Sequence, residues 1–141
     1  MQILAQLRNT ASDHQVSVST AGGARPLDVA GRPGGGSAVN GGEFLMLALA
    51  TCYCNDLYRE AARLQITLTA VEVEASAEFD GIGLAARDIR YRARVASPAP
   101  AERIEQLLRE TDAVAEVHNT LRAGAAVQRL PWPAAAADGS A

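Results

Sequence analysis

The sequence predicts an α+β fold organised around one central helix. The stretch 41–64 begins with an unbroken apolar run and then becomes amphipathic, as in a helix whose first half is buried all round and whose second half has one wet face. Apolar and charged residues then alternate through 71–79 and again through 88–96, a pattern typical of strands. A second helical period begins at Ile104. Helices and an antiparallel hairpin are therefore expected in one chain.

Length, composition and charge set the broad class of the protein. The 141 residues fit one domain, which we assign to residues 1–130, followed by a loose C-terminal tail over 131–141. Hydrophobic residues make up 48% and charged residues 21% of the chain, as in an ordinary globular protein. The net charge of −3 gives no bulk attraction to nucleic acid or to an anionic membrane, so we expect neither as a partner. Met1–Gln15 lacks the pattern of a signal peptide, which predicts a cytoplasmic protein with reduced thiols.

The N-terminal part of the chain predicts short strands and a flexible loop. Met1–Asp13 has weak periodicity and is either a strand or a frayed end, whereas His14–Thr20 alternates as a short strand does. Ala21–Gly23 follows as a turn, and Pro26–Ala30 is the expected returning strand of a hairpin. Gly31–Gly42 is glycine-rich but contains no lysine, so we interpret it as a flexible entry to the helix and not as a phosphate-binding loop.

The segments Ile66–Phe79 and Asp88–Ala96 predict an antiparallel hairpin. A bulge or break is expected near Ala70, because the apolar residues before it are out of phase with those after it. One face of the hairpin should carry a row of glutamates across from a row of arginines, namely Glu72, Glu74 and Glu78 opposite Arg90, Arg92 and Arg94. We interpret this face as a solvated, neutralised surface.

Two helices and a final strand are expected after the hairpin. The first helix has its apolar positions at i, i+3, i+4 and i+7, at Ile104, Leu107, Leu108 and Thr111. Thr111 is a candidate cap for a second short helix, with Asp112 in its first turn and Gly124 at its end. The buried stripe of that helix should be Val114, Val117 and Leu121. Ala125–Leu130 is the expected last strand, with the tail pinned by Trp132.

The central helix carries the only two cysteines, Cys52 and Cys54. Cys52 lies one turn past the apolar run, where a cysteine serves either as a small core hydrophobe or as a reactive thiol. Reactivity requires help from outside the helix, because Cys52 is too far from the helix N-terminus and Asp56 opposes a thiolate unless Arg59 neutralises it. Cys54 lies about 200° round the helix, so a disulfide between the two cysteines requires local unwinding. Two cysteines are too few for a zinc site without histidine, and we expect no metal or cofactor.

The sequence resembles the OsmC/Ohr family of osmotically inducible protein C and organic hydroperoxide resistance proteins. The resemblance rests on GGEFLMLALATCYCNDLYREAARL, on the strands VEVEASAEF and IRYRARV, and on DAVAEVHNTLR, and it covers roughly Asp13–Leu130. It implies two long central helices covered by strongly curved antiparallel sheets, in an intertwined homodimer. It also implies a peroxidatic cysteine on the central helix, with a second cysteine that resolves the sulfenic acid as a disulfide.

The resemblance carries over only in part. Cys52 falls on the peroxidatic position, but Ala115 stands where the second cysteine would be. Gly42 takes the place of the family's helix-entry glutamate, and Glu43 follows one residue late. The arginine that this glutamate positions in the family has two candidates in the preceding segment, Arg25 and Arg32.

These residues predict a thiol-dependent reduction of organic hydroperoxides by Cys52, which is recycled by an external thiol reductant and less favourably by Cys54. His118 is expected either to assist from the face it shares with Ala115 or to make a structural hydrogen bond. The alternative function is a non-catalytic dimer that binds an apolar small molecule in an interface pocket lined by Phe44, Met46, Leu49 and Tyr53. A structural or interaction protein with an inert cysteine is the third hypothesis.

Overall fold

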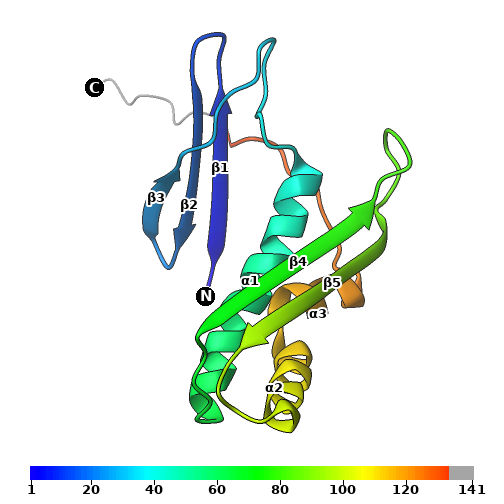
Figure 1. Ribbon diagram of the computed structural model, residues 1–141. Helices are drawn as coiled ribbons and strands as arrows, with labels where there is room; N and C mark the ends of the chain where they lie inside the picture. Colours follow the sequence, from blue (N-terminus) through cyan, green and yellow to red (C-terminus); the bar gives the residue numbers. More distant parts are fainter. Residues whose placement is uncertain (134–141) are drawn as a thin grey trace.

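The computed structural model describes residues 1–133 and confirms the α+β class. A three-stranded and a two-stranded antiparallel sheet accompany three helices (Figure 1). In chain order the elements are β1 (Ile3–Asn9), β2 (His14–Thr20), β3 (Gly23–Leu27), α1 (Gly41–Arg63), β4 (Ala70–Glu78), β5 (Arg87–Ala96), α2 (Ala101–Val114) and α3 (Glu116–Ala123). Among the described residues, no helix has the length and apolar character needed to cross a membrane.

The central helix α1 begins at a capping box and is 23 residues long, close to the predicted bounds. The Asn40 side chain accepts a hydrogen bond from the Glu43 amide at 2.9 Å, and the Glu43 carboxylate accepts one from the Asn40 amide at 2.7 Å. This reciprocal pairing satisfies backbone donors that the first turn of a helix otherwise leaves free. The Glu43 side chain is therefore held at the very start of α1.

The two halves of α1 differ in their burial. The C-terminal half supplies the core through Tyr53, Leu57 and Ala61, which pack with Leu107 of α2 and the inner face of the hairpin. The N-terminal half was predicted to be buried all round, and within a single chain that is wrong, since Leu47 is 57% exposed. No element of the described part of the chain covers this side of the helix, because β4 and β5 cross α1 on its other side (Figure 1).

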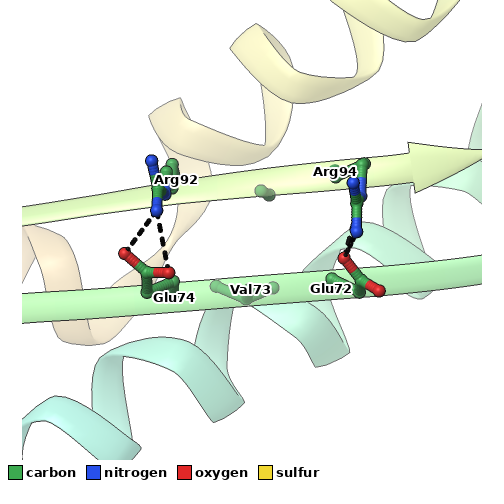
Figure 2. A pocket seen from close by; sticks show the side chains of 6 residues that line it. Glu72, Val73, Glu74, Arg92 and Arg94 are labelled. Atoms are coloured by element: carbon green, nitrogen blue, oxygen red, sulfur yellow. Dashed lines mark hydrogen bonds and ion pairs between the residues drawn. The ribbon is translucent and has the colours of Figure 1, made fainter.

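The predicted hairpin of β4 and β5 is confirmed. The first strand begins at Ala70, where the sequence pattern changes phase. Two of the charged pairs form as expected, Glu72 opposite Arg94 and Glu74 opposite Arg92 (Figure 2). The pairing expected for Arg90 is wrong, because a register shift between Ser76 and Glu78 places Arg90 across from Ser76 and Arg87 across from Glu78.

The N-terminal sheet has the order β1-β2-β3 and lies apart from the packed body of the chain (Figure 1). The strand His14–Thr20 has the predicted bounds, and Ile3–Asn9 pairs with it as a strand. The returning strand was placed too late in the sequence, since it occupies Gly23–Leu27. The turn is tight, because Ala21 and Gly22 both take positive φ values of 51° and 86°, so pairing resumes at once.

The cap predicted for the last helix is wrong. Thr111 does not cap a second helix, because α2 continues to Val114 and carries Thr111 into the core with no exposed surface. The break falls at Ala115, whose ψ of 102° is extended, and α3 follows directly. Gly124 ends α3 as predicted, in the left-handed conformation with φ 68°.

The chain after α3 does not form the expected last strand. Residues 125–133 have no assigned helix or strand, and Val127 is 97% exposed. Trp132 does not pin the tail to the body of the chain, since it is 91% exposed. The remaining part of the predicted tail, 134–141, lies outside the described residues.

Candidate functional site

The Cys52 thiol lies where α1 meets the first residues of α3. Its sulfur is half-buried and donates to Asp56 Oδ2 at 3.5 Å, one helical turn further along α1. Glu116 Oε2 lies 3.9 Å from the same sulfur. The buried Ala115 ends α2 and turns the chain, so that the first turn of α3 faces the thiol.

Two opposing influences act on the thiol. Burial is the largest and raises the pKa of the Cys52 thiol, and the negative charges of Asp56 and Glu116 raise it further. The backbone N–H of Val117 acts in the opposite direction and lowers the pKa. Val117 is the second residue of α3, so this amide belongs to a helix N-terminus that favours negative charge. The influence that favours a thiolate thus comes from outside α1, but burial outweighs it and the pKa of the Cys52 thiol stays raised.

Arg59 neutralises the two carboxylates beside the thiol. Its guanidinium lies 2.7 Å from Asp56 Oδ1 and 3.6 Å from Glu116 Oε1. Burial raises the pKa of the Asp56 carboxyl, which makes this group a stronger proton acceptor than an exposed aspartate. The sulfur and the two carboxylates lie within 4.8 Å of one another, a spacing that a metal ion could bridge. Arg59 already supplies the positive charge there, so we assign no metal to this cluster.

Glu43 does not reach Cys52 within one chain. It precedes Cys52 by nine residues, which places it about 13 Å away along the helix axis and on the opposite face. Position 42 is crowded, because a Cβ on Gly42 would lie 3.1 Å from two ring carbons of Phe79, which would have to shift to admit the family's glutamate. Glu43, Met46 and Phe79 line a mostly apolar groove of about 540 Å³ at this end of α1.

Neither of the two candidate arginines is among the described partners of the thiol. Arg25 lies on β3, Arg32 lies in the loop before α1, and both are exposed. Among the described residues, the side chains that hydrogen-bond to the Cys52 thiol are Asp56 and Glu116. Cys54 is a half-buried free thiol, and so is Cys52.

His118 is buried between two tyrosines and is not a partner of Cys52. Its ring centroid lies 4.5 Å from that of Tyr91, edge to face, and 5.6 Å from that of Tyr53. Neither ring nitrogen has a hydrogen-bond partner within residues 1–133. Burial lowers the pKa of His118, and the positive charge of Arg122 lowers it further. His118 shares the helix face predicted for it, but it contacts aromatic rings there.

Sequence reasoning missed Glu116 and Val117 as neighbours of the thiol. An acidic residue in the first turn of a helix is a recognisable signal, and Glu116 occupies that position. The contact between that turn and Cys52 depends on how α3 packs against α1, which no local pattern encodes.

The depression between the charged rows of the hairpin is a weaker candidate. It has a volume of about 500 Å³ and is lined by Glu72, Glu74, Arg92 and Arg94 (Figure 2). These acids and bases already pair across the strands, so they leave no uncompensated charge for a ligand.

Comparison with known proteins places the chain in a structural context. Residues 34–128 match the family described as OsmC-like protein. Among solved structures, the chain is similar to an OsmC-like protein from Mycoplasma pneumoniae, with 17% identity, a TM-score of 0.58, and coverage of 86% of this chain and 89% of that one. An organic hydroperoxide resistance protein OsmC from Legionella pneumophila is 16% identical, with a TM-score of 0.58 and coverage of 86% and 90%.

An organic hydroperoxide resistance protein from Elizabethkingia anophelis is also 16% identical, with a TM-score of 0.55 and coverage of 88% and 93%. No curated protein shows significant similarity to the sequence. At these identities the solved structures establish a shared fold.

Proposed function

We propose, from the premise that this chain belongs to the OsmC-like protein family, that it reduces organic hydroperoxides with the Cys52 thiol. The observation that carries the proposal is the environment of that thiol. A proton acceptor, Asp56, lies 3.5 Å from the sulfur, and the backbone N–H of Val117, from another helix, lowers the pKa of the thiol. Two solved structures of similar fold are described as organic hydroperoxide resistance proteins.

The reaction begins with transfer of the thiol proton to Asp56. The Cys52 thiolate, held by the Val117 amide, attacks the terminal oxygen of the hydroperoxide, and the O–O bond breaks. The leaving alkoxide takes the proton from Asp56, so the products are a Cys52 sulfenic acid and an alcohol. Arg59 balances the charge of Asp56 while the carboxylate is ionised. Thiol plus hydroperoxide thus gives sulfenic acid plus alcohol, with no other oxidant or reductant.

Recycling requires an external thiol. Ala115 occupies the family position of the second cysteine, so the sulfenic acid has no resolving thiol there. A small thiol condenses with the sulfenic acid and releases water, and a second thiol then reduces the mixed disulfide to restore Cys52. Cys54 is a less favourable partner, because residues two apart on a helix diverge.

We also propose that the protein acts as a homodimer. The N-terminal sheet presents apolar side chains to solvent, including Ile3, Leu7 and Leu27, and it packs only sparsely on the rest of its chain. Leu47 is exposed on the uncovered side of α1. A second copy would cover these surfaces. If Glu43 contributes to the site at Cys52, it must do so from that second copy, since the two residues lie on opposite faces of one helix.

The proposed activity is tested by one equivalent of an organic hydroperoxide added to the reduced protein. A sulfenic acid should form at Cys52 and be trapped by a dimedone-type reagent. Cys52→Ser should abolish hydroperoxide consumption, and the matched control Cys54→Ser should change it little. Reaction of Cys52 no faster than a free peptide cysteine would refute the enzymatic proposal.

The second candidate function is apolar ligand binding without turnover. It is favoured by one observation, namely that burial raises the pKa of Cys52 and so opposes the thiolate within a single chain. In that case the cysteine serves as a core residue beside an interface pocket. The dimedone experiment distinguishes the two candidates.

A further inference from the structure

The short helix α3 is anchored to the rest of the chain by one buried side chain. Among its eight residues His118 alone is buried, with 3% of its surface exposed. The imidazole lies between Tyr53 of α1 and Tyr91 of β5, and the ring centroids are 5.6 Å and 4.5 Å apart. So short a helix is not stable by itself, because helix nucleation is costly. The position of α3 therefore depends on the packing of this imidazole.

The ion pairs of α3 add little to this anchor. Arg122 pairs with Asp112 at 2.6 Å, and Glu116 lies 3.6 Å from the Arg59 guanidinium. All four side chains are more than a third exposed, and pairs of this kind contribute little to stability.

The imidazole is accommodated only in its neutral form. Both ring nitrogens are covered and have no partner within residues 1–133. A second proton would place a full charge between two aromatic rings, where neither water nor a hydrogen-bond acceptor meets it. Protonation is therefore expected to drive the ring out of this position.

The carboxylates around the imidazole do not relieve this cost, because both already have partners. Asp112 of α2 accepts a hydrogen bond from the Tyr91 hydroxyl and pairs with Arg122. Asp56 of α1 pairs with Arg59 at 2.7 Å. Each carboxylate raises the pKa of the imidazole, but burial is the largest influence and lowers it, and the positive charge of Arg122 lowers it further.

The same helix turn carries the residues beside the Cys52 thiol. Glu116 and Val117 directly precede His118, and Glu116 Oε2 lies 3.9 Å from the sulfur. The backbone N–H of Val117 lowers the pKa of the thiol. If His118 leaves the two tyrosines, this first turn of α3 loses its anchor and no longer covers Cys52.

The sign of the pH dependence follows from the two positions of the imidazole. Between the tyrosines its pKa is lowered, whereas a released imidazole regains the ordinary pKa of about 6.5. The released form therefore binds the proton more tightly, and its share increases as the pH falls. The docked form is favoured at neutral pH.

We propose that His118 is a pH-sensitive switch that controls the exposure of the Cys52 thiol. In its neutral form His118 holds α3 against α1 and β5. When it takes up a proton it leaves the two tyrosines, and the first turn of α3 withdraws from Cys52. The inference goes beyond the proposed function, since it holds whether or not Cys52 reduces hydroperoxides, and it is tested without a hydroperoxide.

The first test measures access to the thiol in the full chain carrying Cys54→Ser. The rate at which Cys52 reacts with 4,4′-dithiodipyridine is divided by the rate for N-acetylcysteine at the same pH, which removes the pH dependence common to thiols. Between pH 7.5 and 4.5 this ratio should rise about tenfold, since a pKa difference of about one unit changes the released-to-docked ratio by that factor.

His118→Phe is the matched variant for this measurement. Phenylalanine keeps an aromatic ring between the tyrosines but takes up no proton, so the ratio should rise far less than in the parent. Protonation of Asp56 and Glu116 acts on both proteins and cancels in the comparison. An equal rise in the parent and in His118→Phe would overturn the proposal.

Amide hydrogen exchange shows where the chain opens. In the parent, the protection factors of α3 should fall in the pH range in which His118 titrates by NMR, whereas those of the β4–β5 hairpin should persist, because the opening is local. Titration of His118 with α3 still protected would overturn the proposal, and so would loss of hairpin protection together with that of α3. This measurement needs no substitution in α3, so it remains decisive if His118→Phe does not fold.

Discussion

The thiol of Cys52 donates a hydrogen bond to the carboxylate of Asp56 across 3.5 Å, one helical turn along α1. The relationship has two consequences of opposite sign. The negative charge of Asp56 raises the pKa of the thiol, which disfavours the thiolate, yet the same carboxylate is placed to accept the thiol proton. Arg59 at 2.7 Å keeps Asp56 charge-balanced in the half-buried site.

Asp56→Asn separates these two effects. Removing the negative charge should lower the pKa of the Cys52 thiol, measured from the pH dependence of its alkylation by iodoacetamide. Hydroperoxide reduction by the thiolate should nevertheless slow by about 100-fold, because general acid–base catalysis typically contributes a factor of that order or more. Glu116→Gln is the matched control, since it should also lower the thiol pKa but leave the proton acceptor in place. Faster reduction by Asp56→Asn would show that Asp56 acts only through its charge.

Stability should decrease as the pH falls through the titration of His118. Burial lowers the pKa of His118 in the folded protein, so the unfolded chain binds the proton more readily, and ΔG of unfolding rises with pH in this range. The contribution of neutral His118 to the free energy of unfolding is complete above the pKa of about 6.5 that histidine has in the unfolded chain. It is lost as the pH drops below that value. Urea unfolding between pH 7.5 and 5 measures the slope. His118→Gln should flatten the slope, because it removes the buried group that titrates in this range.

Charge reversal on the hairpin should cost little. Arg92 lies 2.9 Å from Glu74, and both side chains are more than half exposed. Arg92→Glu should therefore lower the free energy of unfolding by about 1 kcal/mol or less. The loss should shrink in high salt, and Glu74→Arg in the same chain should restore the pair. Failure to fold would mean that this face of the hairpin is covered by a partner.

The sequence was most informative where a local pattern decides the structure. The helix from Gly41 and the hairpin strands were predicted to within a few residues, since periodicity and capping act over one or two turns. Thr111 was misread because a buried threonine at i+7 of an apolar stripe and a helix cap look alike in sequence. Arg90 was mispaired because β5 has one more residue than β4 between the pairs Ser76–Arg90 and Glu78–Arg87, and this one-residue register shift leaves no local signal.

The site was harder to predict than the fold. Cys52, Asp56 and Arg59 lie within two turns of one helix, so their mutual influence follows from spacing alone. Glu116 and Val117 reach the thiol only because the chain turns at Ala115, after α2, and α3 packs against α1, a contact across 64 residues. The environment of His118, on α3, depends in the same way on Tyr91, which comes from β5.

The proposed homodimer makes a prediction about shared sites. Cys52→Ser and Glu43→Gln should each be inactive if the site draws Cys52 from one subunit and Glu43 from the other, and glutamine preserves the capping box. Unfolding the two variants together and refolding them should restore about a quarter of the parent activity, since half of the dimers are mixed and each holds one complete site. The measurement is hydroperoxide consumption by the mixture, with each variant refolded alone as the control. Full activity of Glu43→Gln would remove Glu43 from the site, and sedimentation as a folded monomer would refute the dimer itself.

A second thiol at position 115 should convert the proposed one-cysteine site into a two-cysteine site. Ala115 is buried directly before Glu116 and Val117, whose side chain and amide contact the Cys52 sulfur. In the Cys54→Ser background, Ala115→Cys should give an intramolecular disulfide with Cys52 after one equivalent of hydroperoxide, detected as the loss of two hydrogen masses under non-reducing conditions. Trapping by dimedone should fall at least tenfold, and excess hydroperoxide should produce less of the irreversible sulfinic acid, because disulfide formation competes with further oxidation.

The buried site must accept a larger side chain at a cost of about 1–3 kcal/mol, so thermal unfolding of the Ala115→Cys variant is measured alongside. Ala113→Cys is the matched control, since this exposed residue of α2 precedes the break at Ala115 and should leave dimedone trapping unchanged. A folded Ala115→Cys protein that still accumulates the sulfenic acid would show that position 115 cannot bring a thiol to Cys52.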